Sequence, residues 1–246
     1  MMPLKTKEKM LELIKDGLSL NKISKQTGLA KTTIYYYSRK IKGKQYFEPE
    51  FDLKYSEIEG EIAGIFAGDG SQHHDSKQGQ YRVNVHFGKT DYVFYVKDLF
   101  DKYFNKEFRL NYESRGIMRL CTESKKIFFH FKNYLDYNPK IKHCTVELKT
   151  LDFPEKFLIG FLRGFLDTDG TIARCADRPM RIVYTTTSEK LSKQLKEILK
   201  QFDIACGGYV QKRSGLKDLY HVYILARSDE RFLNLVRPYK RKCLGL

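Results

Sequence analysis

Apolar residues along the chain follow two periods that alternate in a regular order. Between residues 81 and 87 every second position is apolar, which predicts a strand with one core face and a polar face bearing Arg82, Asn84 and His86. From residue 91 to 104 apolar residues recur every three or four positions, which predicts a helix. Half-buried strands mixed with amphipathic helices indicate an α+β fold.

The same order of elements is predicted twice, as helix, two strands, helix, two strands and helix. The first copy is expected over residues 56–146 and the second over 147–246. Strands of the second copy are predicted at residues 171–175, 181–186, 208–213 and 220–225, and helices at 188–202 and 229–236. We therefore expect two pseudo-symmetric αββαββα units, each with a four-stranded antiparallel sheet.

The first helix of each copy contains a related stretch of small and apolar residues. Residues 62–70 are IAGIFAGDG, and residues 162–170 are LRGFLDTDG. Asp69 and Asp169 stand at the same place in the two stretches, 100 residues apart. Lys140-Ile141-Lys142 and Lys240-Arg241-Lys242 repeat at the same spacing, so the sequence predicts a duplicated unit of about a hundred residues.

Start and stop signals bound both of these helices. We expect a capping box at each start and a left-handed glycine just after each end. The capping pairs are Ser56 with Glu59 and Asp152 with Glu155, and the glycines are Gly70 and Gly170.

Small residues four positions apart line one face of each helix. A glycine inside a helix costs about 1 kcal/mol relative to alanine, and close approach of a second backbone accounts for that cost. We predict that the two faces pack together around a pseudo-twofold axis. The interface residues are Gly64 and Gly68 in the first helix, and Gly164 and Thr168 in the second.

This packing would place Asp69 and Asp169 side by side at the helix C-termini, where unpaired carbonyls add negative charge. The two carboxylates, with the ends of the helices at Gly68 and Thr168, would suit a hard divalent cation. We expect Mg²⁺, with Mn²⁺ as a possible substitute. Two buried helices with incidental Asp-Gly ends are the alternative, and the duplication argues against it.

Composition narrows the class of partner. Lys and Arg number 45 against 30 Asp and Glu, so the net charge is +15 and a polyanionic partner is expected. The five cysteines are scattered, which argues against a zinc site or a disulfide framework. No apolar run approaches the 18 residues that a membrane span needs, and the Lys-rich N-terminus lacks the apolar segment of a signal peptide. We expect a monomer without membrane contact, located in the cytoplasm, an organellar matrix or the nucleoid.

The two stretches resemble the LAGLIDADG motif of homing endonucleases in the single-chain, two-motif form. The resemblance covers about residues 56–246, and the first copy departs from it at Ala67, where the family often has an acidic residue. It implies a DNA-cleaving fold with metal ions between the helix ends, bound by the later aspartate of each motif. It also implies a basic residue after the last helix of each unit, which by position is Lys142 and Lys242.

Residues 1–45 are predicted to form a separate all-α domain, joined by a linker at residues 46–55. Residues 19–35 resemble the helix-turn-helix of resolvases and many repressors. In that motif the last helix enters the major groove with its N-terminal residues. These residues are Lys31, Thr32, Thr33, Tyr35 and Tyr36. A three-helix cap without a role in DNA binding is the alternative.

The polar faces of the two predicted sheets could together form a saddle for a DNA duplex. In the second sheet a one-residue shift would turn the candidates to the other face. The candidate DNA-reading residues are Arg82, Asn84, His86, Arg109, Asn111 and Arg119 in the first unit, and Arg174, Arg181, Gln211, Arg213 and His221 in the second.

The sequence thus predicts a site-specific endonuclease that cuts both strands of a long, pseudo-palindromic DNA site. Catalysis is assigned to Asp69, Asp169, Lys142 and Lys242, in a two-metal manner. Two alternatives use the same scaffold: a DNA-binding regulator that does not cut, and a maturase that binds intron RNA. Retention of both aspartates speaks against the regulator, and nothing in the sequence excludes the maturase.

Overall fold

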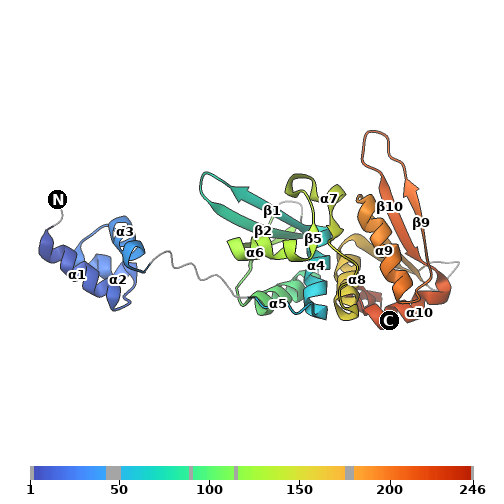
Figure 1. Cartoon of the computed structure of the whole chain (residues 1–246), viewed down its shortest axis with the longest axis horizontal. Helices are drawn as coiled ribbons and strands as arrows, with labels where there is room; N and C mark the ends of the chain where they lie inside the picture. The colour runs from blue at the N-terminus through green and yellow to red at the C-terminus, as the bar shows by residue number, and fades with distance from the viewer. Residues whose placement is uncertain (1–2, 43–50, 89–90, 114–115, 175–179, 245–246) are drawn as a thin grey trace. The chain divides into compact units, whose positions relative to one another are not determined.

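The computed structural model describes residues 3–42, 51–88, 91–113, 116–174 and 180–244, with only the backbone described at Lys42 and at residues 242–244. The chain divides into two compact units, Met1–Phe47 and Glu48–Leu246 (Figure 1). The predicted boundary between two homologous units near residue 146 stays a prediction, because residues 48–246 cluster as one body.

The N-terminal unit is a bundle of three short helices, α1 (Leu4–Lys15), α2 (Leu20–Thr27) and α3 (Lys31–Lys42). Ser19 caps α2 by accepting a hydrogen bond from the Lys22 amide, and Gly28 ends it with a left-handed φ of 69°. The apolar stripes of the helices meet in a small core of Met10, Ile14, Ile23 and Ile34.

The first half of the larger unit contains α4 (Glu57–Asp69), β1 (Gly70–Asp75), β2 (Gln80–Phe87), α5 (Tyr92–Phe104), β3 (Arg109–Tyr112), β4 (Met118–Glu123) and α6 (Lys125–His130). Its four strands form an antiparallel sheet in the order β1-β2-β4-β3. Val83, Val85 and Phe87 point into the core, as the alternation predicted.

The helix that the order of elements predicts at the end of the first copy, expected from the sequence at residues 127–135, is interrupted. α6 is followed by a 3₁₀ turn, η2 (Phe131–Asn133), and then by β5 (Leu135–Asp136), η3 (Pro139–Ile141), α7 (Lys142–Thr145) and β6 (Glu147–Leu148). Leu135 pairs with Leu148 across β5 and β6. The prediction of one continuous helix was wrong because this long-range pairing draws the chain out of the helix.

The second half repeats the order with α8 (Glu155–Asp169), β7 (Gly170–Ala173), β8 (Arg181–Thr186), α9 (Glu189–Gln201), β9 (Cys206–Gln211), β10 (Leu219–Ile224), η4 (Ala226–Ser228), α10 (Asp229–Val236) and η5 (Tyr239–Leu244). Its sheet has the matching order β7-β8-β10-β9. The predicted fold class is confirmed: α+β, with two αββαββα units preceded by a small all-α unit.

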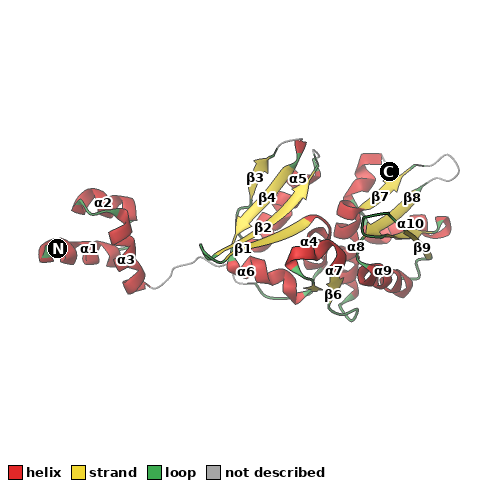
Figure 2. Ribbon diagram, turned by 90° about the horizontal axis from the view of Figure 1, so that it is seen from above, coloured by secondary structure: helices red, strands yellow, loops and turns green. Residues whose placement is uncertain are grey.

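Helices α4 and α8 lie side by side between the two sheets (Figure 2). A Cβ added at Gly64 would lie 2.3 Å from the Phe161 carbonyl oxygen, and one at Gly164 would lie 2.1 Å from the Glu61 carbonyl oxygen. Such distances leave no room for a side chain, so the two backbones touch. Gly68 faces Thr168, whose Oγ1 would lie 2.2 Å from the added Cβ.

Two further glycines extend this contact by one helical turn. An added Cβ at Gly60 or at Gly160 would lie 1.9 Å from a backbone oxygen of the opposite helix. These glycines were missed from the sequence, although they too are 100 residues apart and four positions before Gly64 and Gly164. The repeated spacing of four residues between glycines was the sequence signal for both of them.

Two details of the helix ends differ from prediction. Gly70 has a φ of −76° and Gly170 a φ of −106°, so neither is left-handed. Each helix instead passes straight into a strand. Glycine is needed for lack of space: an added Cβ at Gly70 would lie 2.5 Å from the Phe66 carbonyl oxygen, and one at Gly170 would lie 2.6 Å from the Leu166 carbonyl oxygen.

Only one of the two predicted capping boxes forms. Ser56 and Glu59 make a reciprocal box at the start of α4. At α8 the N-cap position is Pro154, and Asp152 is hydrogen-bonded to Thr150 instead.

None of the helices in the described residues combines the length and the apolar character that a membrane span requires.

The contact between α4 and α8 leads to a prediction about stability. Gly64→Ala should lower the free energy of unfolding by about 1–3 kcal/mol, because the methyl group collides with backbone atoms that cannot move independently. Gly88→Ala is the matched control, since an added Cβ there meets nothing within 4 Å. Urea unfolding of both variants tests this, and equal stabilities would contradict the backbone contact.

Candidate active site

Asp69 and Asp169 end α4 and α8, and the helix contact brings their carboxylates to one place. Burial, and then the negative charge of Asp169, raise the pKa of Asp69 to about 7, against the opposing charges of Lys142 and Lys240. Asp169 reaches solvent, but the protein atoms crowded around its carboxylate raise its pKa as well. A cation between or beside the two carboxyl groups would favour their ionised forms.

Lys142 is buried and lies against the end of α4. Its Nζ donates hydrogen bonds to the carbonyl oxygens of Phe66, Ala67 and Gly68, at 2.8, 2.5 and 2.9 Å. Burial lowers the pKa of Lys142 to about 8, although the charges of Asp169 and Asp69 oppose the decrease. The ammonium group thus stabilises helix-end carbonyls that have no partner within the helix.

Lys240 makes the same kind of contact at the end of α8. Its Nζ donates to the carbonyl oxygens of Leu166, Thr168 and Gly170, at 3.0, 3.3 and 2.5 Å. Lys142 and Lys240 are therefore spatial counterparts, although they are 98 residues apart in sequence.

This pairing differs from the repeat of the two lysine triplets in the sequence, and the assignment of Lys242 stays a prediction. The spacing of 100 residues matched Lys142 with Lys242, but the structural counterpart of Lys142 is Lys240, because the loops before the two lysines differ in length. Lys140, the sequence match of Lys240, is exposed. The side chain of Lys242 lies outside the described part of the structure.

Asp167 was not predicted as a site residue. Its side chain is buried and accepts hydrogen bonds from the backbone amides of Tyr239 and Lys240, at 2.8 and 2.9 Å. Burial raises the pKa of Asp167 to about 6, against the hydrogen bonds from Lys240 and Tyr239. A sequence signal existed, since Asp167 is an acid inside an apolar run where the first copy has Ala67.

An ion-pair network joins the two halves away from the aspartates. Arg163 of α8 donates to both Glu57 and Glu61 of α4, and to the Val236 carbonyl oxygen at 2.7 Å. The Tyr95 hydroxyl donates to Glu61 at 2.6 Å. The buried charges are thus paired across the contact, as burial requires.

The metal ligands that the site can offer are few. Asp69 and Asp169 supply carboxylate oxygens, but the predicted carbonyls of Gly68 and Thr168 already accept hydrogen bonds from Lys142 and Lys240. In the part of the chain that the structure describes, no group of three Asp, Glu, His or Cys side chains could hold a metal ion. The two carboxylates fit a hard divalent ion that completes its shell with water or phosphate oxygens.

The candidate DNA-reading residues of the first sheet share one face. The antiparallel register sets Arg82 opposite Glu123, Asn84 opposite Cys121, and His86 opposite Arg119. Arg109 and Asn111 of β3 lie opposite Cys121 and Arg119, on the same face. Asn84 is only 7% exposed, which makes it the least accessible member of this group.

Acidic partners, which the sequence reasoning missed, hold the arginines of this face. Glu123 pairs with Arg82 at 3.2 Å and with Arg109 at 3.7 Å. Glu113 pairs with Arg119 at 3.0 Å. The face therefore presents oriented guanidinium groups, and its charge is partly balanced.

In the second sheet Arg181, Gln211 and His221 share the outward face. His221 lies opposite Thr185 and Tyr209, and Arg181 lies opposite Ala173. Two candidates do not lie in the strands. Arg213 is bonded to the Lys217 carbonyl oxygen in the loop between β9 and β10, and Arg174 is exposed just after β7.

The N-terminal unit exposes most of the residues that the helix-turn-helix resemblance selected. Lys31, Thr32, Tyr35 and Tyr36 are exposed on α3, and Thr33 is half-buried. The Nζ of Lys40 lies 4.7 Å from the centre of the Tyr36 ring. The exposed face of α3 is thus basic and aromatic.

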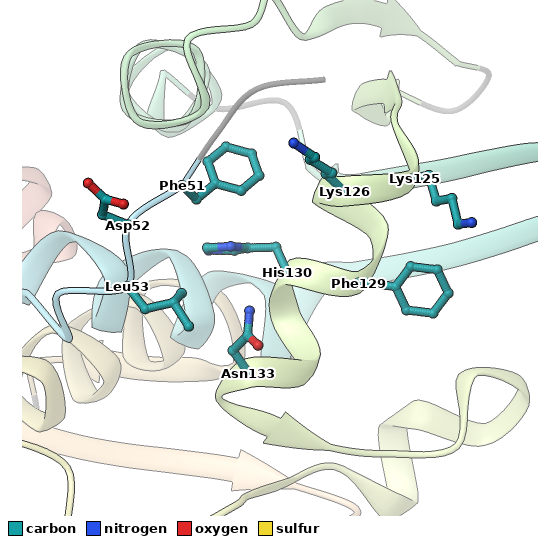
Figure 3. A pocket seen from close by; sticks show the side chains of 8 residues that line it. All are labelled: Phe51, Asp52, Leu53, Lys125, Lys126, Phe129, His130 and Asn133. Atoms are coloured by element: carbon teal, nitrogen blue, oxygen red, sulfur yellow. The ribbon is translucent and has the colours of Figure 1, made fainter. Parts of the chain in front are cut away.

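A cavity of about 740 Å³ lies elsewhere, between residues 51–53 and α6 (Figure 3). Phe51, Phe129 and His130 contribute to its lining, and none of the candidate site residues does. Burial lowers the pKa of His130 to about 4, so its ring stays neutral and packs against Phe51. The cavity belongs to the packing of this edge and not to the aspartate pair.

Comparisons with known proteins bear on the fold of the larger unit. Residues 156–236 match a family model described as LAGLIDADG-like domain. A search of curated protein sequences found no significant match.

Solved structures share the fold. The chain is similar to the structure of I-DmoI in complex with DNA and Mn, at 16% identity and a TM-score of 0.55, over 74% of this chain and 97% of that one. It is similar to the N-terminal LAGLIDADG domain of DUF199/WhiA at 17% identity and a TM-score of 0.51, over 76% of this chain and 85% of that one.

The larger unit therefore has the fold of the LAGLIDADG homing endonucleases, the class to which I-DmoI belongs. Within it, residues 156–236 form a LAGLIDADG-like domain.

The raised pKa of Asp69 leads to a prediction about pH. Between about pH 4 and 7 the native protein holds a proton on Asp69 that the unfolded chain has lost, so the free energy of unfolding falls as pH rises through this range. Asp69→Asn removes the buried charge. It should therefore stabilise the metal-free protein at pH 8, on the order of 2 kcal/mol, and much less at pH 5.

Thermal melts in a chelator at both pH values measure this difference. Asp203→Asn is the control, because Asp203 is exposed and far from the pair in sequence. A lower melting temperature for Asp69→Asn at pH 8 would contradict the account.

Proposed function

We propose that the protein is a divalent-metal-dependent endonuclease that cuts both strands of double-stranded DNA at a specific site. The observation that carries the proposal is the twofold arrangement of Asp69 and Asp169 with Lys142 and Lys240. Two equivalent sets of acid and lysine suit a reaction that must be performed once on each strand.

Asp69 and Asp169 would hold the metal ions, Mg²⁺ by preference and Mn²⁺ as a substitute. The ions would supply activation of water and stabilisation of the leaving oxygen. Lys142 and Lys240 would contribute fixed positive charge beside the phosphate, where negative charge develops during the reaction. Their ammonium groups are already held by helix-end carbonyls and need little reorganisation.

DNA is proposed as the partner because I-DmoI, which shares the fold, was crystallised with it. I-DmoI was crystallised with DNA and Mn and with DNA and Ca, and a variant of it with its target DNA and Mg. In this chain the net charge of +15 and the polar outward faces of both sheets support the same partner. The N-terminal unit would add a contact to the flank of the site through the exposed face of α3.

A DNA-binding protein that does not cut is the second candidate. One observation favours it: Lys142 and Lys240 place two positive charges beside the two aspartates, so part of the aspartate charge is compensated without a metal ion. Fold alone does not decide between the two functions.

The experiment that tests the proposal begins with DNA selected for binding from a random pool. Asp69→Asn and Asp169→Asn should each abolish double-strand cleavage in Mg²⁺ and leave binding in Ca²⁺ unchanged, because the amide holds a divalent ion poorly. Asp98→Asn on the exposed side of α5 is the control. Wild-type binding without cleavage would establish the second candidate, and cleavage at the wild-type rate by either variant would overturn the shared metal site.

The N-terminal unit gives a separate prediction. A chain that begins at residue 51 should cut the same central site, but bind more weakly and protect a footprint shortened on one flank only. Each lost phosphate contact should reduce the slope of log affinity against log salt by about 0.9. The full-length triple variant Lys31→Ala, Thr32→Ala, Thr33→Ala is the control for folding and should lose the same flank. An unchanged footprint and salt slope would show that α3 does not touch DNA.

A further inference from the structure

The buried acid Asp167 links the second motif helix to the segment that carries Lys240. Its Oδ2 accepts the Tyr239 amide at 2.8 Å and its Oδ1 accepts the Lys240 amide at 2.9 Å. The side chain is 4% exposed, so both bonds are shielded from water. Hydrogen bonds from amides to a buried carboxylate are among the stronger ones in proteins.

Lys240 is consequently held at both ends. Its backbone amide is fixed by Asp167, and its Nζ is fixed by the carbonyl oxygens at the end of α8. The chain reaches this position through an abrupt turn, because Arg237 has a left-handed φ of 51° and Pro238 follows it. Asp167 binds the backbone amides of the two residues that follow this turn.

Within the residues that the structure describes, the first unit has no equivalent of this support. Ala67 stands at the position of Asp167, one turn after Ala63 and two residues before Asp69. The segment before Lys142 is held within its own loop, where Asn138 accepts the Lys140 amide at 3.0 Å and Thr145 donates to the Ile141 carbonyl oxygen at 3.0 Å. The two lysines thus have equivalent ammonium contacts and different backbone supports.

We infer that Asp167 is a positioning residue for Lys240, and that it serves only one of the two strand-cutting reactions. The inference rests on the proposed nuclease function for its strand assignment, but the positioning itself does not. Asp167 touches neither phosphate nor the reacting atoms in this assignment. It acts by keeping the Lys240 ammonium group at the end of α8.

The first measurement does not depend on cleavage. Reductive methylation of surface amines, followed by mass spectrometry, reports how often each lysine leaves its contacts. In the full chain, Asp167→Ala should raise the labelling rate of Lys240 by about tenfold, the loss expected for about 1.4 kcal/mol of restraint. The labelling of Lys142 should not change. Asp167→Asn keeps one acceptor oxygen, so it should raise the labelling rate of Lys240 by less. It replaces the alanine variant in this test if that variant folds poorly.

A matched control separates positioning from general loss of stability. Glu59→Gln alters another buried carboxylate of the same helix pair, which accepts the backbone amides of Lys54 and Ser56 and the Tyr134 hydroxyl and is not bonded to the Lys240 segment. It should lower the melting temperature without raising the labelling of Lys240. Equal labelling of Lys240 in wild type, Asp167→Ala and Asp167→Asn would overturn the inference.

The second measurement follows the nicking of each strand of a selected target labelled at both ends. Asp167→Ala should slow one strand by about tenfold and the other by less than about twofold. Lys240→Met should slow nicking of the same strand, and Lys142→Met should slow nicking of the opposite strand. The double variant Asp167→Ala, Lys240→Met should nick no more slowly than Lys240→Met alone. Equal slowing of both strands by Asp167→Ala would overturn the inference. A wild type that cuts neither strand would refute the proposed function, and the labelling result would then decide the positioning role.

Discussion

The direct backbone contact between α4 and α8 is the constraint on which the rest of the larger unit depends. Glycines at every fourth position let the two helices touch, and this contact alone brings their C-termini together. Once the ends meet, two aspartates, two sets of unpaired carbonyls and two lysines must occupy one small volume. Carbonyl dipoles and carboxylates both attract cations, so the two lysines partly compensate the negative charge that the helix packing concentrates at these ends.

The sequence was most informative where a pattern repeats over a short distance. Alternation in β2 and the matched glycines of the two motif helices predicted strands, faces and the pairing of Asp69 with Asp169, because these depend on local periodicity. The repeat also contained Gly60 and Gly160, which a search for spacings of four would have found. The fold class followed from the order of these elements.

Prediction failed where the outcome depends on loops or on distant partners. The spacing of 100 residues did not find Lys240 as the counterpart of Lys142, because the two loops that precede these lysines differ in length. Gly70 and Gly170 are glycines for lack of space and not for a left-handed turn, which only the neighbouring side chains reveal. The partners of the sheet arginines, such as Glu123, come from strands far apart in sequence and could not be paired without the register.

The two sheets obey the twofold relation in strand order but not in side chains. The first presents arginines held by acids, whereas the second presents Arg181 on the same face as Thr185, Tyr209 and His221. Symmetry is required most strictly along the line where α4 meets α8, because there the backbone of each half packs directly against the backbone of the other. A duplicated chain of this design is therefore free to change one sheet without disturbing the other. The surface residues of its two halves can diverge while the helix contact that joins them is kept.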